Sequence, residues 1–223
     1  MIEPNDPIYR NVENDLKEGE IMSPMDPPKI YDMPKQEEYS FDDYAEPIKV
    51  LLKEHEDYLE VLNDFETHLM FFRGNEYEFT PEISNSFKKF FKFMDEHTVP
   101  HNEKEEKALF PLLRSRLIEV GECSPGMNKT TPTDVMEGEH LQVAQASYLV
   151  FNLLGLGSKL PDQNSRKIVF QNAVEQAREI VETMKVHIYK ENNVLFPLAQ
   201  KHLRDDEWTA IGEKMGLDSN FTV

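Results

Sequence analysis

The strongest constraint on the fold is a pattern that the sequence contains twice. Residues 101–113 read HNEKEEKALFPLL and residues 187–199 read HIYKENNVLFPLA, so a histidine, a lysine, a glutamate and a Leu-Phe-Pro-Leu ending recur 86 residues later. A second pair of segments precedes them: EPIKVLLKEH at 46–55 and TPTDVMEGEH at 131–140 share proline, valine, glutamate and histidine. The chain therefore contains two copies of one unit, and we expect it to fold as two similar halves.

Each copy has the apolar pattern of a pair of helices. Apolar residues recur at three- and four-residue steps, prolines mark helix starts, and Gly74 and Gly121 mark two helix ends. The expected helices span residues 47–74, 80–121 and 131–157, with a fourth starting at Asp162 or Ser165 and a short fifth at 205–216. The expected inward stripe of the fourth helix is Ile168, Val169, Val174, Ala177, Ile180, Val181 and Met184.

Four long helices joined by short loops, without any strand pattern, predict an all-α fold. The expected architecture is an up-and-down antiparallel four-helix bundle built from two helical-hairpin repeats, over residues 44–204. Residues 1–43 are rich in proline and acids with no sustained apolar period, so we expect an extended acidic arm there. We expect the arm to be a mobile tail; the alternative is that its tyrosines and methionines hold parts of it against the domain or against a second subunit in a homodimer. Residues 205–223 are expected to form a short C-terminal helix and a tail.

The composition narrows the classes of partner. Asp and Glu number 42 against 24 Lys and Arg, a formal charge of −18, which argues against nucleic acid or an anionic membrane as a partner. The sequence has no apolar run of the roughly 20 residues that span a bilayer and no signal-peptide pattern. Cys123 is the only cysteine, so the chain has no intrachain disulfide and no cysteine metal site. These features predict a cytoplasmic protein.

The repeated motif places histidine and glutamate on one helix face. Residues four apart lie one turn apart on the same side of a helix, as His101 and Glu105 do, and an antiparallel partner helix brings another histidine to the same depth. Two carboxylates in a bundle interior are costly unless they are neutralised, and a pair of metal ions neutralises them. Imidazole and carboxylate donors suit iron, zinc or manganese. The candidate metal ligands are therefore His55, His101, Glu105, His140, His187 and Glu191.

These motifs resemble the hemerythrin-like family, whose members carry an HHE cation-binding domain. The family's Glu-His pairs on helices one and three resemble Glu54-His55 and Glu139-His140, and its His-x-x-x-Glu followed by Leu-Phe-Pro matches both copies of the repeat over residues 46–202. The resemblance implies a non-haem di-iron site with both glutamates as bridges. The implied cofactor is two iron ions, Fe2+ or Fe3+, with a bridging oxo or hydroxo group; manganese and zinc are less expected.

One departure from the family bears on function. Oxygen-carrying hemerythrins place a second histidine four residues from the first on helix three, where this chain has Met136 and Ala144. The set of four histidines and two glutamates resembles instead hemerythrin-like proteins linked to nitric oxide, peroxide or iron-centre repair. It implies a protein that binds or reacts with nitric oxide, hydrogen peroxide or dioxygen in redox or gas response.

Several points of this interpretation stay open. If the protein is an enzyme, it is a di-iron oxidoreductase with an electron-transfer partner; the alternative is a non-catalytic iron-binding or storage protein, or an oxygen sensor. No residue is assigned a catalytic role. The Cys-bearing N-terminal module of the iron-centre repair proteins has no counterpart here, which weakens that assignment. The two-fold repeat also predicts two nearly equivalent metals, each with an exchangeable position.

Four further residues lie beside the candidate ligands. Glu54 and Glu139 directly precede two of the histidines, and they are either hydrogen-bond partners of the ligands or solvated acids. Tyr58, one turn after His55, is a candidate hydrogen-bond donor or a core residue. His97, one turn before His101, is a candidate hydrogen-bond partner, an extra ligand or a histidine at the rim.

The Phe-Pro pair that ends each motif has a structural role in this scheme. Proline lacks an N–H and its ring clashes with the preceding turn, so Pro100, Pro111 and Pro197 are expected to kink or divide their helices. Phe110 and Phe196 are expected to cap the metal site and exclude water.

Overall fold

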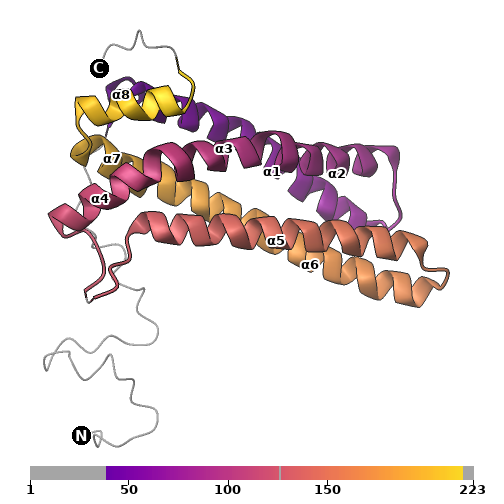
Figure 1. The fold of residues 1–223 in the computed structure, drawn as a ribbon. Helices are drawn as coiled ribbons and strands as arrows, with labels where there is room; N and C mark the ends of the chain where they lie inside the picture. The colour runs from indigo at the N-terminus through magenta and orange to yellow at the C-terminus, as the bar shows by residue number, and fades with distance from the viewer. Residues whose placement is uncertain (1–38, 126, 218–223) are drawn as a thin grey trace, which may run out of the picture. The chain divides into compact units, whose positions relative to one another are not determined.

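The computed structural model describes residues 39–125 and 127–217, which are mostly helical (Figure 1). Within these residues there is no strand, which confirms the predicted all-α class. The helices are α1 (Glu46–Gly74), α2 (Pro81–Phe93), α3 (Val99–Lys104), α4 (Phe110–Val120), α5 (Pro132–Lys159), α6 (Gln163–Lys190), α7 (Phe196–His202) and α8 (Asp205–Lys214).

Short π-helical segments join several of these helices into longer rods. Met94–Thr98 joins α2 to α3, Glu105–Leu109 joins α3 to α4, and Glu191–Leu195 joins α6 to α7. In each case the helix that follows has a proline as its second residue, so the wide turn comes just before the residue that cannot donate a hydrogen bond. The prolines therefore divide the α-helical hydrogen bonding, as predicted, but the backbone stays helical through each of them.

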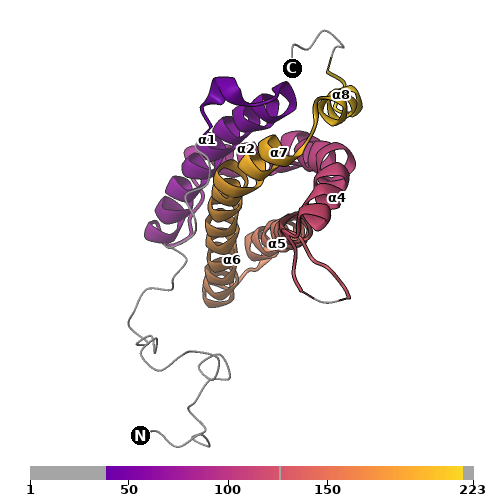
Figure 2. The ribbon, with the colours of Figure 1, turned by 90° about the vertical axis from the view of Figure 1, so that its left-hand side faces the viewer.

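Successive rods run in opposite directions (Figure 1). Helix α1 is followed by the returning rod α2–α4, then by α5, and then by the returning rod α6–α7. Helix α1 packs against α2 and α6, and α5 packs against α6. In the view turned by 90°, α1 lies on one side of α6, and α4 and α5 lie on the other (Figure 2).

Capping residues explain where the rods begin. Thr80 accepts a hydrogen bond from the backbone N–H of Ile83, and Asp162 accepts from two backbone N–H groups at the start of α6. Thr131 and Asp134 form a reciprocal capping box at the start of α5. Helix α5 continues to Lys159, beyond the predicted end at residues 155–157.

The apolar core is divided into two clusters. One cluster fills the end of the bundle where α1 meets α2 and α5 meets α6, and it is rich in aromatic rings: Phe65 stacks on Phe90 with ring centroids 3.8 Å apart. The other lies among the start of α1, α4, α7 and α8, with Trp208 of α8 only 5% exposed. Leu51 belongs to the second cluster and Tyr58 to the first, so His55 lies between them on α1. The polar site is thus enclosed by apolar packing on both sides.

One predicted core position is wrong. Ile168 is 62% exposed, whereas Phe170 is fully buried against Phe72 and Tyr77. Val174, Ile180 and the rest of the later stripe are buried or nearly so, so the error is confined to the first turns of α6.

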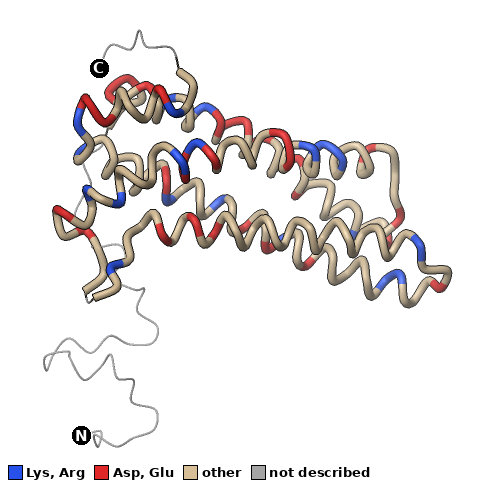
Figure 3. The backbone as a smooth tube through the Cα atoms, in the orientation of Figure 1, with Lys and Arg blue, Asp and Glu red and all other residues tan. Residues whose placement is uncertain are grey.

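The predicted N-terminal arm lies mainly outside the described residues. Residues 1–38 and the tail residues 218–223 are not described; Phe41–Asp43 form a short 3-10 turn, capped by Ser40, before α1. The predicted short C-terminal helix corresponds to α8. Lys and Arg are interspersed with Asp and Glu along the described helices (Figure 3). Among those helices, none is both long and apolar enough to cross a bilayer.

Gly157 on α5 lies where a methyl group does not fit, which gives a test of the packing. A Cβ atom at this position would lie 2.4 Å from Cε1 of Phe170 on α6. We expect Gly157→Ala to destabilise the protein by about 1–3 kcal/mol, because the buried ring has to move.

Gly155→Ala is the matched control for that substitution. Nothing outside its own helix lies within 4 Å of a Cβ at Gly155, so alanine should stabilise α5 by roughly 0.5–1 kcal/mol. Urea unfolding of both variants measures the two effects. A Gly157→Ala protein as stable as the parent would contradict the close helix contact.

Candidate metal centre

The six candidate ligands lie together in the interior. Each has a relative exposure of 6% or less, and both glutamates are fully buried. His55 comes from α1, His101 from α3, His140 from α5 and His187 from α6, while Glu105 and Glu191 are the first residues of two π-helical segments. A π-turn inserts an extra residue into a helix and is frequent at functional sites. The site is therefore built where the helical hydrogen bonding changes.

The ligand atoms form two groups of four. One group contains His55 and His101, the other contains His140 and His187, and both share Glu105 and Glu191, with all ligand atoms of a group within 4.8 Å of one another. The Nε2 atoms are 3.1 Å apart in each histidine pair. Each pair comes from one copy of the sequence repeat, so the groups are related by the repeat.

Each glutamate lies between the two groups. One oxygen of Glu105 is 3.6 Å from Nε2 of His101 and the other is 3.4 Å from Nε2 of His140. The oxygens of Glu191 lie 3.2 Å from Nε2 of His55 and 3.1 Å from Nε2 of His187. Both carboxylates thus direct one oxygen to each group, which is the arrangement of a bridging ligand.

Acids on the same hairpin orient two of the imidazoles. Nδ1 of His101 donates to Glu54 at 2.8 Å, and Lys104 contacts the other oxygen of Glu54. In the second copy, Nδ1 of His187 donates to Glu139 at 2.9 Å, and Lys190 contacts the other oxygen. Fixing the Nδ1 proton in this way directs Nε2 towards the centre.

The remaining two imidazoles are oriented from the opposite hairpin. Nδ1 of His140 donates to Glu106 at 2.8 Å, and Nδ1 of His55 donates to the side-chain oxygen of Asn192 at 2.7 Å. Sequence reasoning missed both residues. They occupy the same position of the repeat, directly after the bridging glutamates, and this alignment is the signal that could have identified them.

The donor set fits metal ions. Because every Nδ1 donates to an oxygen, each neutral imidazole has a lone pair on Nε2, and these lone pairs face each other at 3.1 Å. The four oxygens of Glu105 and Glu191 are buried and accept no hydrogen bond. Lone pairs and carboxylate oxygens that converge without donors require positive charge, which bound cations supply. Imidazole and carboxylate together suit iron, manganese or zinc.

The pKa values of His187 and Glu191 reflect the close approach of imidazoles and carboxylates in the site. Burial lowers the pKa of His187, but the Glu191 carboxylate, followed by Glu139 and Glu105, outweighs burial and raises the pKa to about 9. Burial raises the pKa of Glu191, yet its contacts with His187 and His55 hold it well below the usual range. Without metal, a proton on His187 therefore balances part of the carboxylate charge.

Two phenylalanines enclose the imidazoles. Phe196 stacks on His55 with ring centroids 5.5 Å apart and an interplanar angle of 11°, and Phe110 stacks on His140 at 6.1 Å and 14°. Both phenylalanines are fully buried. They lie directly against the ligand rings, which is where the sequence placed them.

Two of the neighbouring residues do not contact the ligands by hydrogen bonds. His97 is exposed, stacks on Phe93, and belongs to neither group of ligand atoms. Tyr58 is buried, but its hydroxyl donates to the sulfur of Met94 at 3.1 Å.

Two cavities each reach one of the candidate ligands. An apolar cavity of about 190 Å³, lined among others by Phe91, Val143 and Ala144, reaches His140. A more polar cavity of about 130 Å³, lined by His97, Glu96 and Thr98, reaches His101. Ala144, one of the two positions at the spacing of the additional histidine, lines the apolar cavity.

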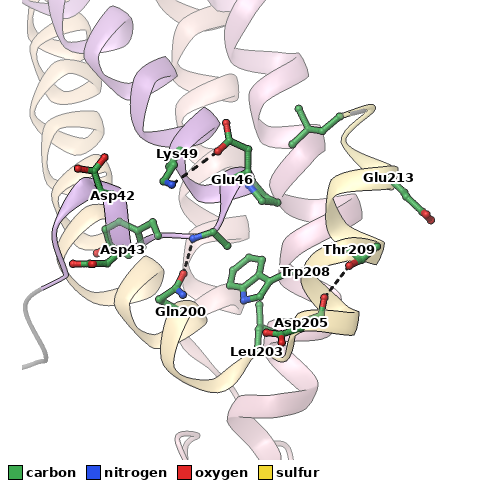
Figure 4. Close-up of a pocket in the computed structure, with 14 residues that line it drawn as sticks. Asp42, Asp43, Glu46, Lys49, Gln200, Leu203, Asp205, Trp208, Thr209 and Glu213 are labelled. Atoms are coloured by element: carbon green, nitrogen blue, oxygen red, sulfur yellow. Dashed lines mark hydrogen bonds and ion pairs between the residues drawn. The ribbon is translucent and has the colours of Figure 1, made fainter. Parts of the chain in front are cut away.

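A further cavity, near α8, contains none of the candidate ligands. Its volume is about 460 Å³, and it lies between the start of α1 and α8, where Trp208 and Gln200 line it (Figure 4). Gln200 accepts a hydrogen bond from the backbone N–H of Ala45 across this cavity. We do not assign the functional site to this cavity, because the buried carboxylates of Glu105 and Glu191 do not line it.

Comparison with known proteins assigns the family. A model of the hemerythrin HHE cation-binding domain matches residues 73–199. The chain belongs to this family. The match contains five of the six candidate ligands; His55 lies before it, and the structure brings that residue to the site.

Curated relatives are about a quarter identical to the chain over the part that aligns. The iron-sulfur cluster repair proteins YtfE of Salmonella paratyphi B, Salmonella newport and Salmonella heidelberg are each 26% identical over 119 residues, which is 53% of this chain and 49% of the relative. The alignment thus covers about half the length of these relatives.

The raised histidine pKa values predict how the metal-free protein responds to pH. A histidine whose folded-state pKa is above its unfolded value stabilises the fold fully below about pH 6.5, and loses that contribution as pH rises through the folded value. For His187 that value is about 9. We expect the Tm of the chelator-treated protein to fall between pH 6.5 and 9.

Thermal unfolding at a series of pH values measures this effect. His187→Asn should flatten the profile, whereas the control His97→Gln, at an exposed position, should keep it. A metal-free protein whose Tm stays constant or rises over this interval would contradict the proposed charge balance.

Loss of one shared carboxylate should lower metal binding. We expect Glu105→Ala and Glu191→Ala each to weaken metal affinity by at least about tenfold, since each removes an oxygen from both groups. Iron per chain after anaerobic loading and desalting is the measurement. Glu103→Ala, at an exposed acid of the same rod, is the matched control, and full iron content in Glu105→Ala would exclude this glutamate as a ligand.

Proposed function

We propose that the protein is an up-and-down hemerythrin-like four-helix bundle that holds two iron ions. In this proposal it binds or reacts with a small diatomic or peroxide ligand in redox or gas response. The observation that carries it is the convergence of four inward Nε2 atoms on four buried carboxylate oxygens that accept no hydrogen bond. The family assignment supports a cation at this place.

The two histidine pairs would each hold one ion. His55 and His101 would bind the first, His140 and His187 the second, and the two glutamates would each contribute an oxygen to both. Bound iron would supply a one-electron change of charge and a position for an external ligand. Four protein donors for each ion leave room for such a ligand, because the additional histidine of oxygen carriers is absent on α5.

The surroundings of the site favour small ligands. The apolar cavity at His140 suits an uncharged diatomic molecule such as nitric oxide or dioxygen, whereas the polar cavity at His101 suits peroxide, water and protons. The Nδ1 partners keep the imidazoles in one orientation, and Phe110 and Phe196 exclude water from the inner faces of two rings. In this proposal the residues of the chain position the small ligand, orient the imidazoles and shield the site from water.

The relatives suggest one specific role. Their printed name is iron-sulfur cluster repair protein, and a related role for this chain is part of the proposal. We also propose a cytoplasmic location and an electron-transfer partner, which repeated redox cycles require. The single cysteine is in keeping with that location.

Rapid mixing of the iron-loaded, reduced protein with each small molecule tests the proposed function. We expect nitric oxide or peroxide to react within milliseconds to seconds, with a change in near-ultraviolet and visible absorption. Multiple turnovers with peroxide would identify an enzyme, and a stable nitric oxide adduct would identify a sensor or carrier. Absence of any spectral change with all three molecules, in a protein that holds two irons, would contradict the proposal and leave iron storage.

A further inference from the structure

The residues that hold the ligand histidines by hydrogen bonds match between the two halves of the site except at one position. Glu54 corresponds to Glu139 and Lys104 to Lys190, and both pairs make the same contacts. The phenylalanines also correspond, since each stacks on a histidine of the other hairpin. Directly after the bridging glutamate, however, the first copy has Glu106 and the second has Asn192.

This difference lies in contact with the ligands. Glu106 accepts the Nδ1 proton of His140 at 2.8 Å, and Asn192 accepts the Nδ1 proton of His55 at 2.7 Å. The two hydrogen bonds are equivalent in the repeat, because each acceptor side chain contacts a histidine of the opposite hairpin. One acceptor is a carboxylate and the other a neutral amide, so the two halves differ by one formal charge.

The charge of Glu106 is not cancelled locally. Lysines pair with Glu54 and Glu139, whereas among the described residues the recorded ion pair of Glu106 is with His140 itself. Glu137 on α5 adds to the negative field on this side: burial, and then the charge of Glu106, raise the pKa of the Glu137 carboxyl. Arg114 acts in the opposite direction, but its ion pair is with Asp134.

A carboxylate behind an imidazole changes the imidazole as a ligand. It pulls on the Nδ1 proton and makes Nε2 a stronger donor, and its charge lies near the bound cation. An amide oxygen fixes the same tautomer but contributes no net charge. Loss of such a partner typically costs 10–100-fold in metal affinity.

From this difference we infer that the residue after each bridging glutamate makes the metal pair unequal. The group of His140 and His187 binds a divalent cation more tightly than the group of His55 and His101, and it favours the higher charge in a mixed pair. The inference rests on the proposed metal pair. The sequence repeat alone predicts two equivalent metal positions, because the ligands are the same in both. The inferred difference comes only from the hydrogen-bond partners of the ligands.

A Co2+ titration of the metal-free protein tests the inequality without redox chemistry. The protein is labelled with 15N-histidine, and NMR detects the ring N–H signals that Co2+ shifts. At one equivalent of Co2+ we expect most of the bound metal to lie at the His140 and His187 pair. The population with Co2+ at this pair should exceed the population with Co2+ at the other pair by about tenfold or more. Mutual repulsion of two ions cannot produce this preference, because it acts equally on both orders of filling.

Three variants, in which a carboxylate and an amide of the same length are exchanged, test whether the hydrogen-bond partners cause the unequal binding. Glu106→Gln gives both histidines an amide partner, and Asn192→Asp gives both a carboxylate, so each single variant should bring the two populations at one equivalent close to equality. The double variant exchanges the partners and should fill His55 and His101 first. A purely structural role for Glu106 would not reverse the order of filling in the double variant.

The outcomes separate this inference from the proposed function. Two equivalents of Co2+ that distribute evenly in the unchanged protein, or a preference that Glu106→Gln leaves intact, would overturn the inequality alone. Fewer than two equivalents, measured by calorimetry in the same samples, would overturn the metal pair itself. Tm values of the metal-free variants close to the parent value confirm that folding is not what changes.

Discussion

Two buried carboxylates, those of Glu105 and Glu191, face four imidazole nitrogens in the middle of the bundle without a hydrogen-bond donor. Such a set is stable only with added positive charge, from protons on the histidines or from metal ions. The surrounding structure agrees with this requirement: an apolar cluster lies on each side of the site along α1, and each imidazole Nδ1 donates to a side-chain oxygen. A cation bound at this site would therefore stabilise the folded state.

The sequence repeat and the helical period were sufficient to predict the helices, the fold class and the residues that meet in the interior. His101 and Glu105 are close in sequence, so their common face follows from helix geometry alone. Glu106 and Asn192 could not be assigned in this way, because their partners belong to the opposite hairpin and depend on how the rods are rotated. The π-helical segments were missed for a related reason: proline indicates a disturbance, but tertiary packing decides its form.

The fold brings the candidate ligands together, and the residues around them determine which reaction the site can support. Ala144 lines an apolar cavity that reaches His140. A more polar cavity reaches His101. If two ions bind as proposed, similar ligands with different hydrogen-bond partners and different cavities would support different steps at each ion, which a symmetric repeat would not by itself provide.

Anomalous diffraction at the iron absorption edge, from crystals of the iron-loaded protein, tests the central claim most directly. The account predicts two peaks in the bundle interior, one beside His55 and His101 and the other beside His140 and His187, with Glu105 and Glu191 contacting both. A single peak, or peaks only at surface acids such as those near α8, would contradict it.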